Sequence, residues 1–132
     1  MPDYRLSHAA SLVGVSDDTI RRWVDQGKLE ATTDSSGARV IDGAALAAFC
    51  ESQAANPAVT ADREHRVSTR NAFPGIVTRI QLGAVAAQVD VHAGPHRIVS
   101  LITREAVEEL GLEVGDEVIA AVKATNVTVE RP

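Results

Sequence analysis

The sequence predicts an α+β protein of two small domains, a helical domain followed by a strand-rich one. Three observations support this fold class. Apolar residues recur at helical spacing up to about residue 50, and they alternate with other residues from Phe73 onward. Residues 51–67 between these stretches show neither period and contain a proline. We therefore assign residues 1–52 to the first domain, 53–66 to a linker and 67–132 to the second domain.

The composition points to small apolar cores and to association between chains. The 132 residues include one Trp, one Tyr and two Phe, so the cores must be built from Val, Ile, Leu and Ala. Domains of this size lie near the lower limit for independent stability, and we expect oligomerisation to supplement them. A single cysteine, Cys50, excludes an internal disulfide and a multi-cysteine metal site. No apolar run approaches the roughly 20 residues that span a membrane, which favours a cytoplasmic protein with no membrane partner.

The net charge of −5 limits how the chain can bind nucleic acid. Residues 1–56 carry five basic and eight acidic side chains, and residues 57–132 carry eight and ten. Neither half is basic, so any DNA binding must come from a local patch of cations.

The first two helices are expected on either side of Gly14. Ser7 is the predicted N-cap of a helix that runs to about Val13, and Ser16 is the predicted N-cap of the next. Gly14 tolerates the left-handed backbone that a sharp corner requires. The second helix should end at Gly27 and bury one apolar face at i, i+3, i+4 spacing, made of Ile20, Trp23 and Val24.

A small residue, a glycine and an apolar residue follow at spacings of four and six, as Ala10, Gly14 and Ile20. A helix-turn-helix needs this pattern, although helical hairpins with no DNA role share it. The flanking sequence is more specific. The run Ser16-x-x-Thr19-Ile20-Arg21-Arg22-Trp23-Val24-x-x-Gly27-Lys28-Leu29 resembles the recognition helix and wing of the MerR and excisionase-like helix-turn-helix family, and the likeness extends over roughly residues 4–50.

This resemblance implies a winged helix-turn-helix that binds double-stranded DNA. A hairpin from 29–31 to 39–41 corresponds to the wing, and a third helix is expected over about 42–50, with Cys50 packed at its end. Thr32 and Thr33 stand where the family often has an arginine. Solvated surface side chains are the alternative interpretation of the exposed cations. The residues expected to contact DNA are Ser16, Thr19, Arg21, Arg22, Lys28 and Arg39. In the linker, Arg63, His65 and Arg66 could contact DNA or the second domain, but a solvated linker is the favoured interpretation.

The second domain has the pattern of a small OB-like barrel. Thr103 should cap a short helix that ends at Gly111. Five strands and one short helix between the third and fourth strands suggest a five-stranded β-barrel of this kind. The expected strands cover residues 76–82, 85–91, 96–102, 117–123 and 127–129.

Several motifs occur in order along this domain. They are Ser68-Thr69-Arg70-Asn71, Gly75-Ile76-Val77, Gly83-Ala84-Val85, Leu101-Ile102-Thr103, Glu109-Leu110-Gly111-Leu112-x-x-Gly115-Asp116-Glu117-Val118 and Val122-Lys123-Ala124-Thr125-x-Val127. Together they are similar to the molybdate-binding Mop domain of the TOBE family over essentially all of residues 67–131.

The resemblance implies a site for molybdate or tungstate at an interface between associated domains, with no organic cofactor. Arginine and lysine give charge-assisted hydrogen bonds to an oxyanion, and a hydroxyl at a helix N-terminus adds another donor. Ala106 stands where many family members have a serine. The residues that the resemblance assigns to oxyanion binding are Ser68, Thr69, Arg70, Asn71, Thr103, Lys123 and Ala124.

These observations predict a molybdate- or tungstate-responsive transcriptional regulator, associated as a homo-oligomer between a dimer and a hexamer. One alternative is a molbindin-like storage or homeostasis protein whose helix-turn-helix serves assembly. Another is an architectural DNA-binding protein whose barrel only oligomerises. No nucleophile–base pair or phosphate-cradling glycine loop occurs, so we expect no enzyme activity. His92 and His96 bracket a turn but lack the further ligands of a metal site.

Overall fold

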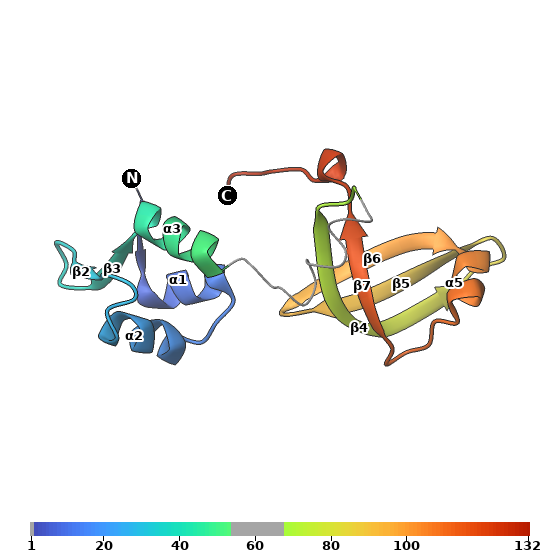
Figure 1. Ribbon diagram of the computed structural model, residues 1–132, viewed down its shortest axis with the longest axis horizontal. Helices are drawn as coiled ribbons and strands as arrows, with labels where there is room; N and C mark the ends of the chain where they lie inside the picture. Colours follow the sequence, from blue (N-terminus) through green and yellow to red (C-terminus); the bar gives the residue numbers. More distant parts are fainter. Residues whose placement is uncertain (1, 54–67) are drawn as a thin grey trace. The chain divides into compact units, whose positions relative to one another are not determined.

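The computed structural model describes residues 2–53 and 68–132, and these two ranges belong to two separate compact units (Figure 1). Gln53 is the last residue of a helix, and the rest of the expected linker, with Arg63, His65 and Arg66, lies outside the described residues. Within the described part, no helix combines the length and apolar character needed to cross a membrane.

The N-terminal unit combines three helices with a small antiparallel sheet. The sheet order is β1-β3-β2, so β3 is central. The first strand was not expected, because its three residues are too short to show an alternating pattern and its partner is far away in the sequence. The elements are β1 (Asp3–Arg5), α1 (Leu6–Val13), α2 (Asp17–Asp25), β2 (Thr32–Thr33), β3 (Arg39–Asp42) and α3 (Gly43–Gln53).

Two of the predicted helix signals are confirmed and one is wrong. Ser16 caps α2, because its hydroxyl accepts the Thr19 N–H at 3.2 Å. Gly14 ends α1 in the left-handed conformation, with a φ of +81°. Ser7, however, lies inside α1 and does not cap it. Arg5 holds the N-cap position with no side-chain cap, because its extended backbone ends β1 and leads straight into the helix.

The corner between α1 and α2 closes over an apolar core. Ala10 and Ile20 are both buried, as the helix-turn-helix pattern predicts. Trp23 is half-buried against this core and packs on Phe49 of α3 with ring centroids 4.9 Å apart. Cys50 is also half-buried and packs against this core, as expected for a residue near the end of the third helix.

The hairpin that corresponds to the wing is shorter than expected. The first strand begins at Thr32 and not at Leu29, because the Leu29 N–H donates to the Trp23 carbonyl oxygen at 3.3 Å in the turn that follows α2. The Asp34 carboxylate organises the turn by accepting the Ser36 N–H at 2.8 Å, the Ala38 N–H at 2.9 Å and the Ser36 hydroxyl at 2.6 Å. These bonds, led by that of the Ser36 hydroxyl, hold the pKa of Asp34 below its ordinary value.

The C-terminal unit is a curved four-stranded antiparallel sheet with the order β6-β5-β4-β7 (Figure 1). One long strand serves both halves of the sheet. Residues 71–76 of β4 pair with β7, residues 76–82 pair with β5, and the register shifts between Val77 and Arg79. The elements are β4 (Asn71–Leu82), β5 (Ala86–Ala93), β6 (His96–Thr103), α5 (Arg104–Leu110), β7 (Glu117–Val122) and the 3-10 turn η1 (Ala124–Asn126).

One face of this sheet holds the core of the unit. Val77, Val89 and Val91 are buried there, and Val107 brings α5 against them. Gly75 is required where β4 crosses β5, because a Cβ at this position would lie 2.5 Å from the His92 carbonyl oxygen. On the other side of β5 the carboxylate of Asp90 is buried. It accepts two bonds from Arg97, at 3.0 and 2.7 Å, and one from the Gln88 amide at 3.0 Å.

The structure shows four of the five strands of the predicted OB-like barrel. Residues 127–129 form no strand; η1 follows β7, and Val129 is 93% exposed. Within the described residues the sheet therefore ends at β6 on one side and β7 on the other. Val-Thr-Val has a high strand propensity, but a strand also needs a partner for its backbone hydrogen bonds, and these three residues pair with no strand of the described chain.

Candidate functional site

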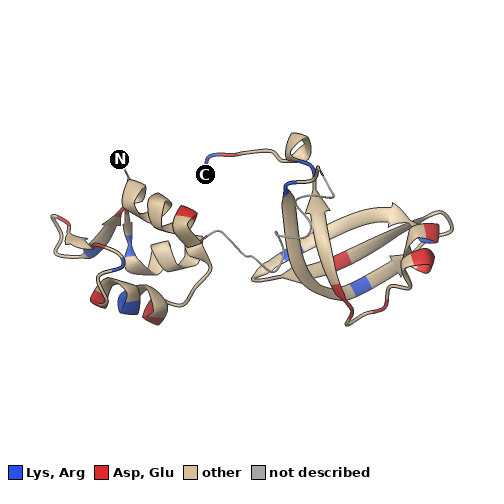
Figure 2. Cartoon of the chain, in the orientation of Figure 1, with Lys and Arg blue, Asp and Glu red and all other residues tan. Residues whose placement is uncertain are grey.

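Most of the predicted oxyanion-binding residues meet at one end of β4. Asn71, the first residue of β4, pairs with Val122, the last residue of β7. This antiparallel register puts Arg70 across from Lys123, and both side chains are exposed. Figure 2 shows basic positions at this end of the sheet. Six of the seven predicted residues therefore gather here, namely Ser68, Thr69, Arg70, Asn71, Lys123 and Ala124.

Thr103 lies at the other end of the sheet. It is the last residue of β6 and pairs with Ala86 at the start of β5. The next residue of β5, Ala87, pairs with Leu82, the last residue of β4. Thr103 therefore lies near the C-terminal end of β4, whereas Arg70 directly precedes the first residue of β4. A strand rises about 3.3 Å per residue, and a tetrahedral oxyanion is only a few ångströms across. One chain therefore does not bring Thr103 together with the other six residues.

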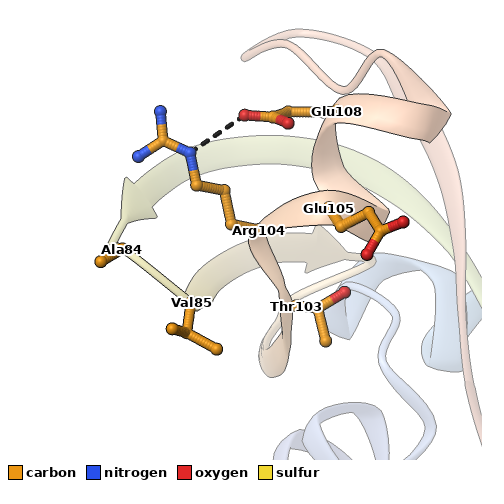
Figure 3. A pocket seen from close by; sticks show the side chains of 6 residues that line it. All are labelled: Ala84, Val85, Thr103, Arg104, Glu105 and Glu108. Carbon is orange, nitrogen blue, oxygen red and sulfur yellow. Dashed lines mark hydrogen bonds and ion pairs between the residues drawn. The ribbon is translucent and has the colours of Figure 1, made fainter.

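The surroundings of Thr103 form a small pocket of about 330 Å³ between the β4–β5 turn and the first turns of α5 (Figure 3). The Thr103 hydroxyl oxygen accepts the Ala106 N–H at 3.0 Å, which confirms the predicted helix cap. The hydroxyl proton of Thr103 remains able to donate to a ligand. The lining residues are Ala84, Val85, Thr103, Arg104, Glu105 and Glu108.

Arg104 is the residue of this pocket that the sequence interpretation missed. Its Nε donates to Glu108 Oε1 at 3.0 Å, and its Nη1 donates to the Gly83 carbonyl oxygen at 3.3 Å. The i, i+4 spacing of Arg104 and Glu108 within the expected helix was a visible signal for the ion pair. Its bond to Gly83, 21 positions away, left no local signal.

The predicted DNA-contacting residues lie on α2, directly before and after it, and on the hairpin that follows. Arg21 and Arg22 are exposed on α2, Lys28 is exposed after its end, and Arg39 is exposed on β3. Ser16 and Thr19 hold each other at the start of α2, with their hydroxyl oxygens 2.9 Å apart. An exposed recognition helix beside a hairpin is the arrangement that a winged helix-turn-helix uses to approach a major groove.

His92 lies on β5 and His96 on β6. His92 is opposite Arg97, and His96 is opposite Ala93. In residues 2–53 and 68–132, no group of three or more His, Cys, Asp or Glu side chains is placed to hold a metal ion.

The two units define a class of protein in which a helix-turn-helix is joined to a small sheet domain with basic side chains, those of Arg70 and Lys123, at one end of its sheet. Residues 4–54 match the helix-turn-helix domain family, and residues 67–129 match the TOBE domain family. The chain belongs to the TOBE family through its C-terminal Mop-type domain and carries an N-terminal helix-turn-helix domain.

Relatives match the C-terminal domain. The chain is 41% identical over 64 residues to molybdenum-pterin-binding protein 2 of Clostridium pasteurianum, covering 48% of this chain and 94% of that protein. It is 38% identical over 63 residues to the molybdenum transport protein ModE of Azotobacter vinelandii, covering 47% of this chain but 23% of ModE. A solved molybdate binding protein from Sporomusa ovata matches 50% of this chain and 98% of its own at 35% identity, with a TM-score of 0.49.

Proposed function

We propose that this protein is a cytoplasmic transcriptional regulator, with no enzyme activity, that binds DNA in response to molybdate or tungstate. The observation that carries this proposal is the joining of a helix-turn-helix to a TOBE domain in one chain. Relatives of the second domain include a molybdenum-pterin-binding protein and the molybdenum transport protein ModE. In this proposal the TOBE domain binds the oxyanion, and the DNA affinity of the helix-turn-helix depends on whether the oxyanion is bound.

The end of β4 supplies the charge for the oxyanion. Arg70 offers a planar fork of N–H donors, and Lys123 offers an ammonium group beside it. Each charge-assisted hydrogen bond contributes about 1.5–3 kcal/mol. Ser68 and Asn71 add polar side chains at the same end, and Thr69 and Ala124 add backbone N–H groups.

The opposite end of the sheet supplies the Thr103 hydroxyl. Since one chain holds Thr103 far from Arg70 and Lys123, the complete site uses Thr103 of one chain and the basic end of a second. Two further features support association through this domain. Its sheet has two edge strands, β6 and β7, and the tail around Val127 and Val129 has strand propensity without a strand partner in the described residues. In this proposal, the tail of one copy pairs with an edge strand of another.

The exposed apolar side chains also support association through the C-terminal domain. Among residues 2–53 and 68–132, twelve large hydrophobic residues are exposed; eleven belong to the C-terminal unit and one, Leu12, to the N-terminal unit. Association would remove many of these side chains from water, and each square ångström of apolar surface that is buried stabilises the assembly by about 25 cal/mol. The C-terminal domain is therefore the assembly domain in this proposal.

A ligand held between two copies couples oxyanion binding to assembly. It binds the associated form better than separate chains and shifts the population toward that form by its differential affinity. A helix-turn-helix protein reads two half-sites about one helical turn apart when its reading heads are paired. Binding of molybdate thus changes how the two recognition helices are presented to DNA.

A storage or homeostasis protein is the second candidate function. It is favoured by one observation: the match covers 94% of molybdenum-pterin-binding protein 2, so that relative is little longer than the matched domain. In this case the helix-turn-helix serves assembly and not DNA recognition.

Calorimetry with molybdate, tungstate and sulfate, together with a gel-shift titration on DNA with and without molybdate, separates these functions. A regulator binds the oxyanion and changes its DNA affinity when the oxyanion is added. Oxyanion binding without any DNA binding supports storage, and DNA binding that ignores molybdate supports an architectural role.

A further inference from the structure

Arg104 joins the two walls of the pocket beside Thr103. Its backbone N–H donates to the Val85 carbonyl oxygen at 2.8 Å, and its guanidinium donates to the Gly83 carbonyl oxygen at 3.3 Å. Both acceptors belong to the β4–β5 turn, whereas Arg104 itself begins α5. The residue next to Thr103 therefore ties the helix to the turn by main chain and side chain together.

The same side chain also controls the charge of the pocket. Glu105 and Glu108 both line it, and an oxyanion brought near two carboxylates is repelled. Figure 3 shows the Arg104 guanidinium reaching toward Glu108, and the two are joined at 3.0 Å. The pair cancels one of the two negative charges, although both of its members are partly exposed, so water screens the effect.

We propose that Arg104 is a positioning residue for the Thr103 wall of the oxyanion site. It fixes this wall by tethering α5 to the β4–β5 turn, and it cancels the charge of Glu108 so that an anion can approach Thr103. This inference rests on the proposed function, because it concerns binding at the same site. It assigns no direct ligand contact to Arg104, whose Nε and Nη1 are directed to Glu108 and Gly83.

The two contributions of Arg104 can be separated by substitution. Arg104→Ala removes the tether and leaves Glu108 without its partner. Glu108→Gln removes the repelling charge but leaves Arg104 able to bond the turn. In the double variant Arg104→Ala/Glu108→Gln the tether is lost but the excess negative charge is not created, so binding should recover in part.

Calorimetric titration of the full-length protein with molybdate tests these expectations at low and high salt. We expect Arg104→Ala to weaken binding about fivefold to tenfold, from the loss of one hydrogen bond and one partly exposed ion pair. Glu108→Gln should bind about twofold tighter than the unsubstituted chain at low salt, and high salt should erase that gain. The matched control Glu109→Gln makes the same change on α5 outside the pocket and should leave binding unaltered.

A ligand-independent measurement accompanies the titrations. The Ala106 N–H is bonded to the Thr103 hydroxyl, so its hydrogen exchange reports whether the Thr103 wall is held in place. Exchange should accelerate in Arg104→Ala and recover in the conservative variant Arg104→Lys. If Arg104→Ala does not fold, Arg104→Lys and Glu108→Gln carry the test.

If molybdate binding does not change in Arg104→Ala, or weakens in Glu108→Gln, the inference about Arg104 is overturned but the proposed function is not. Absence of molybdate binding by the unsubstituted protein overturns the proposed function, and this inference with it.

Discussion

Asn71 and Val122 are opposite one another in the antiparallel pair of β4 and β7, and this register brings Arg70 and Lys123 to one end of the sheet. The two residues are more than fifty positions apart in the sequence. Strand pairing thus converts two separate motifs into one basic surface. Thr103, on the β6–β5 pair, is excluded from that surface by the same topology.

Arg70→Ala and Lys123→Ala should each abolish most molybdate binding. Each substitution removes a charge-assisted hydrogen bond of about 1.5–3 kcal/mol, which corresponds to a loss of affinity of roughly 10- to 100-fold. Both side chains are exposed, so thermal unfolding should stay close to that of the unsubstituted chain. Calorimetry measures the affinity. Arg79→Ala, on the same strand but outside the site, is the matched control; equal affinities in all three variants would reject the assignment.

Arg21→Ala together with Arg22→Ala should weaken DNA binding and flatten its salt dependence. Each phosphate contact contributes about 0.9 to the magnitude of the slope of log affinity against log salt concentration. The slope of the double variant should therefore be smaller in magnitude by up to about 1.8. Gel shifts over a range of salt concentrations measure this slope. An unaltered slope would show that this face of α2 does not contact the DNA backbone. Oxyanion binding serves as the internal control and should not change.

The stability of the C-terminal domain should fall in acid because of Asp90. Bonds from the Gln88 amide and then the Arg97 guanidinium hold the pKa of Asp90 below its ordinary value of 3.8. Since the folded pKa is lower than the unfolded one, the carboxylate stabilises the fold at higher pH, and this contribution is lost as the pH falls through the folded pKa.

Asp90→Asn should therefore be less stable than the unsubstituted chain at neutral pH, and the difference should shrink below a pH of about 4. Chemical unfolding at a series of pH values measures it, and Asp18→Asn, an exposed change on α2, is the control. A difference that stays constant down to pH 3 would contradict the role of this ion pair.

Truncation after Asn126 should reduce both assembly and oxyanion binding. The removed residues include Val127 and Val129, which have strand propensity and are exposed in the single chain. If a second copy accepts this tail, the truncated protein should show a lower mass in light scattering and weaker molybdate binding. The change Val129→Thr keeps the β-branched shape and should retain assembly. An unchanged mass after truncation would exclude the tail from the interface.

Features that depend only on residues close together in the sequence were predictable. Ser16 and Thr103 cap their helices, and Gly14 turns the corner, because each needs only the next few residues to do so. The two-domain α+β class followed from the change in apolar period. The buried Ala10 and Ile20 followed from one pattern of spacing.

Features that depend on distant partners were not predictable. Ser7 lost its expected capping role because Arg5 is drawn into a strand with Val40. The segment 127–129 has strand-forming residues but no strand partner in the described chain, so the fifth strand of the expected OB-like barrel was wrong. The tie from Arg104 to Gly83 crosses 21 positions, and only the folded sheet brings these residues together.

Mixing two defective variants tests most directly whether the oxyanion site is shared between copies. One variant carries Thr103→Ala, and the other carries Arg70→Ala and Lys123→Ala. After the two are unfolded and refolded together, each mixed pair should contain one intact site, so the mixture should bind molybdate in calorimetry although neither variant binds well alone. A mixture that binds no better than the average of its two components would contradict the shared site.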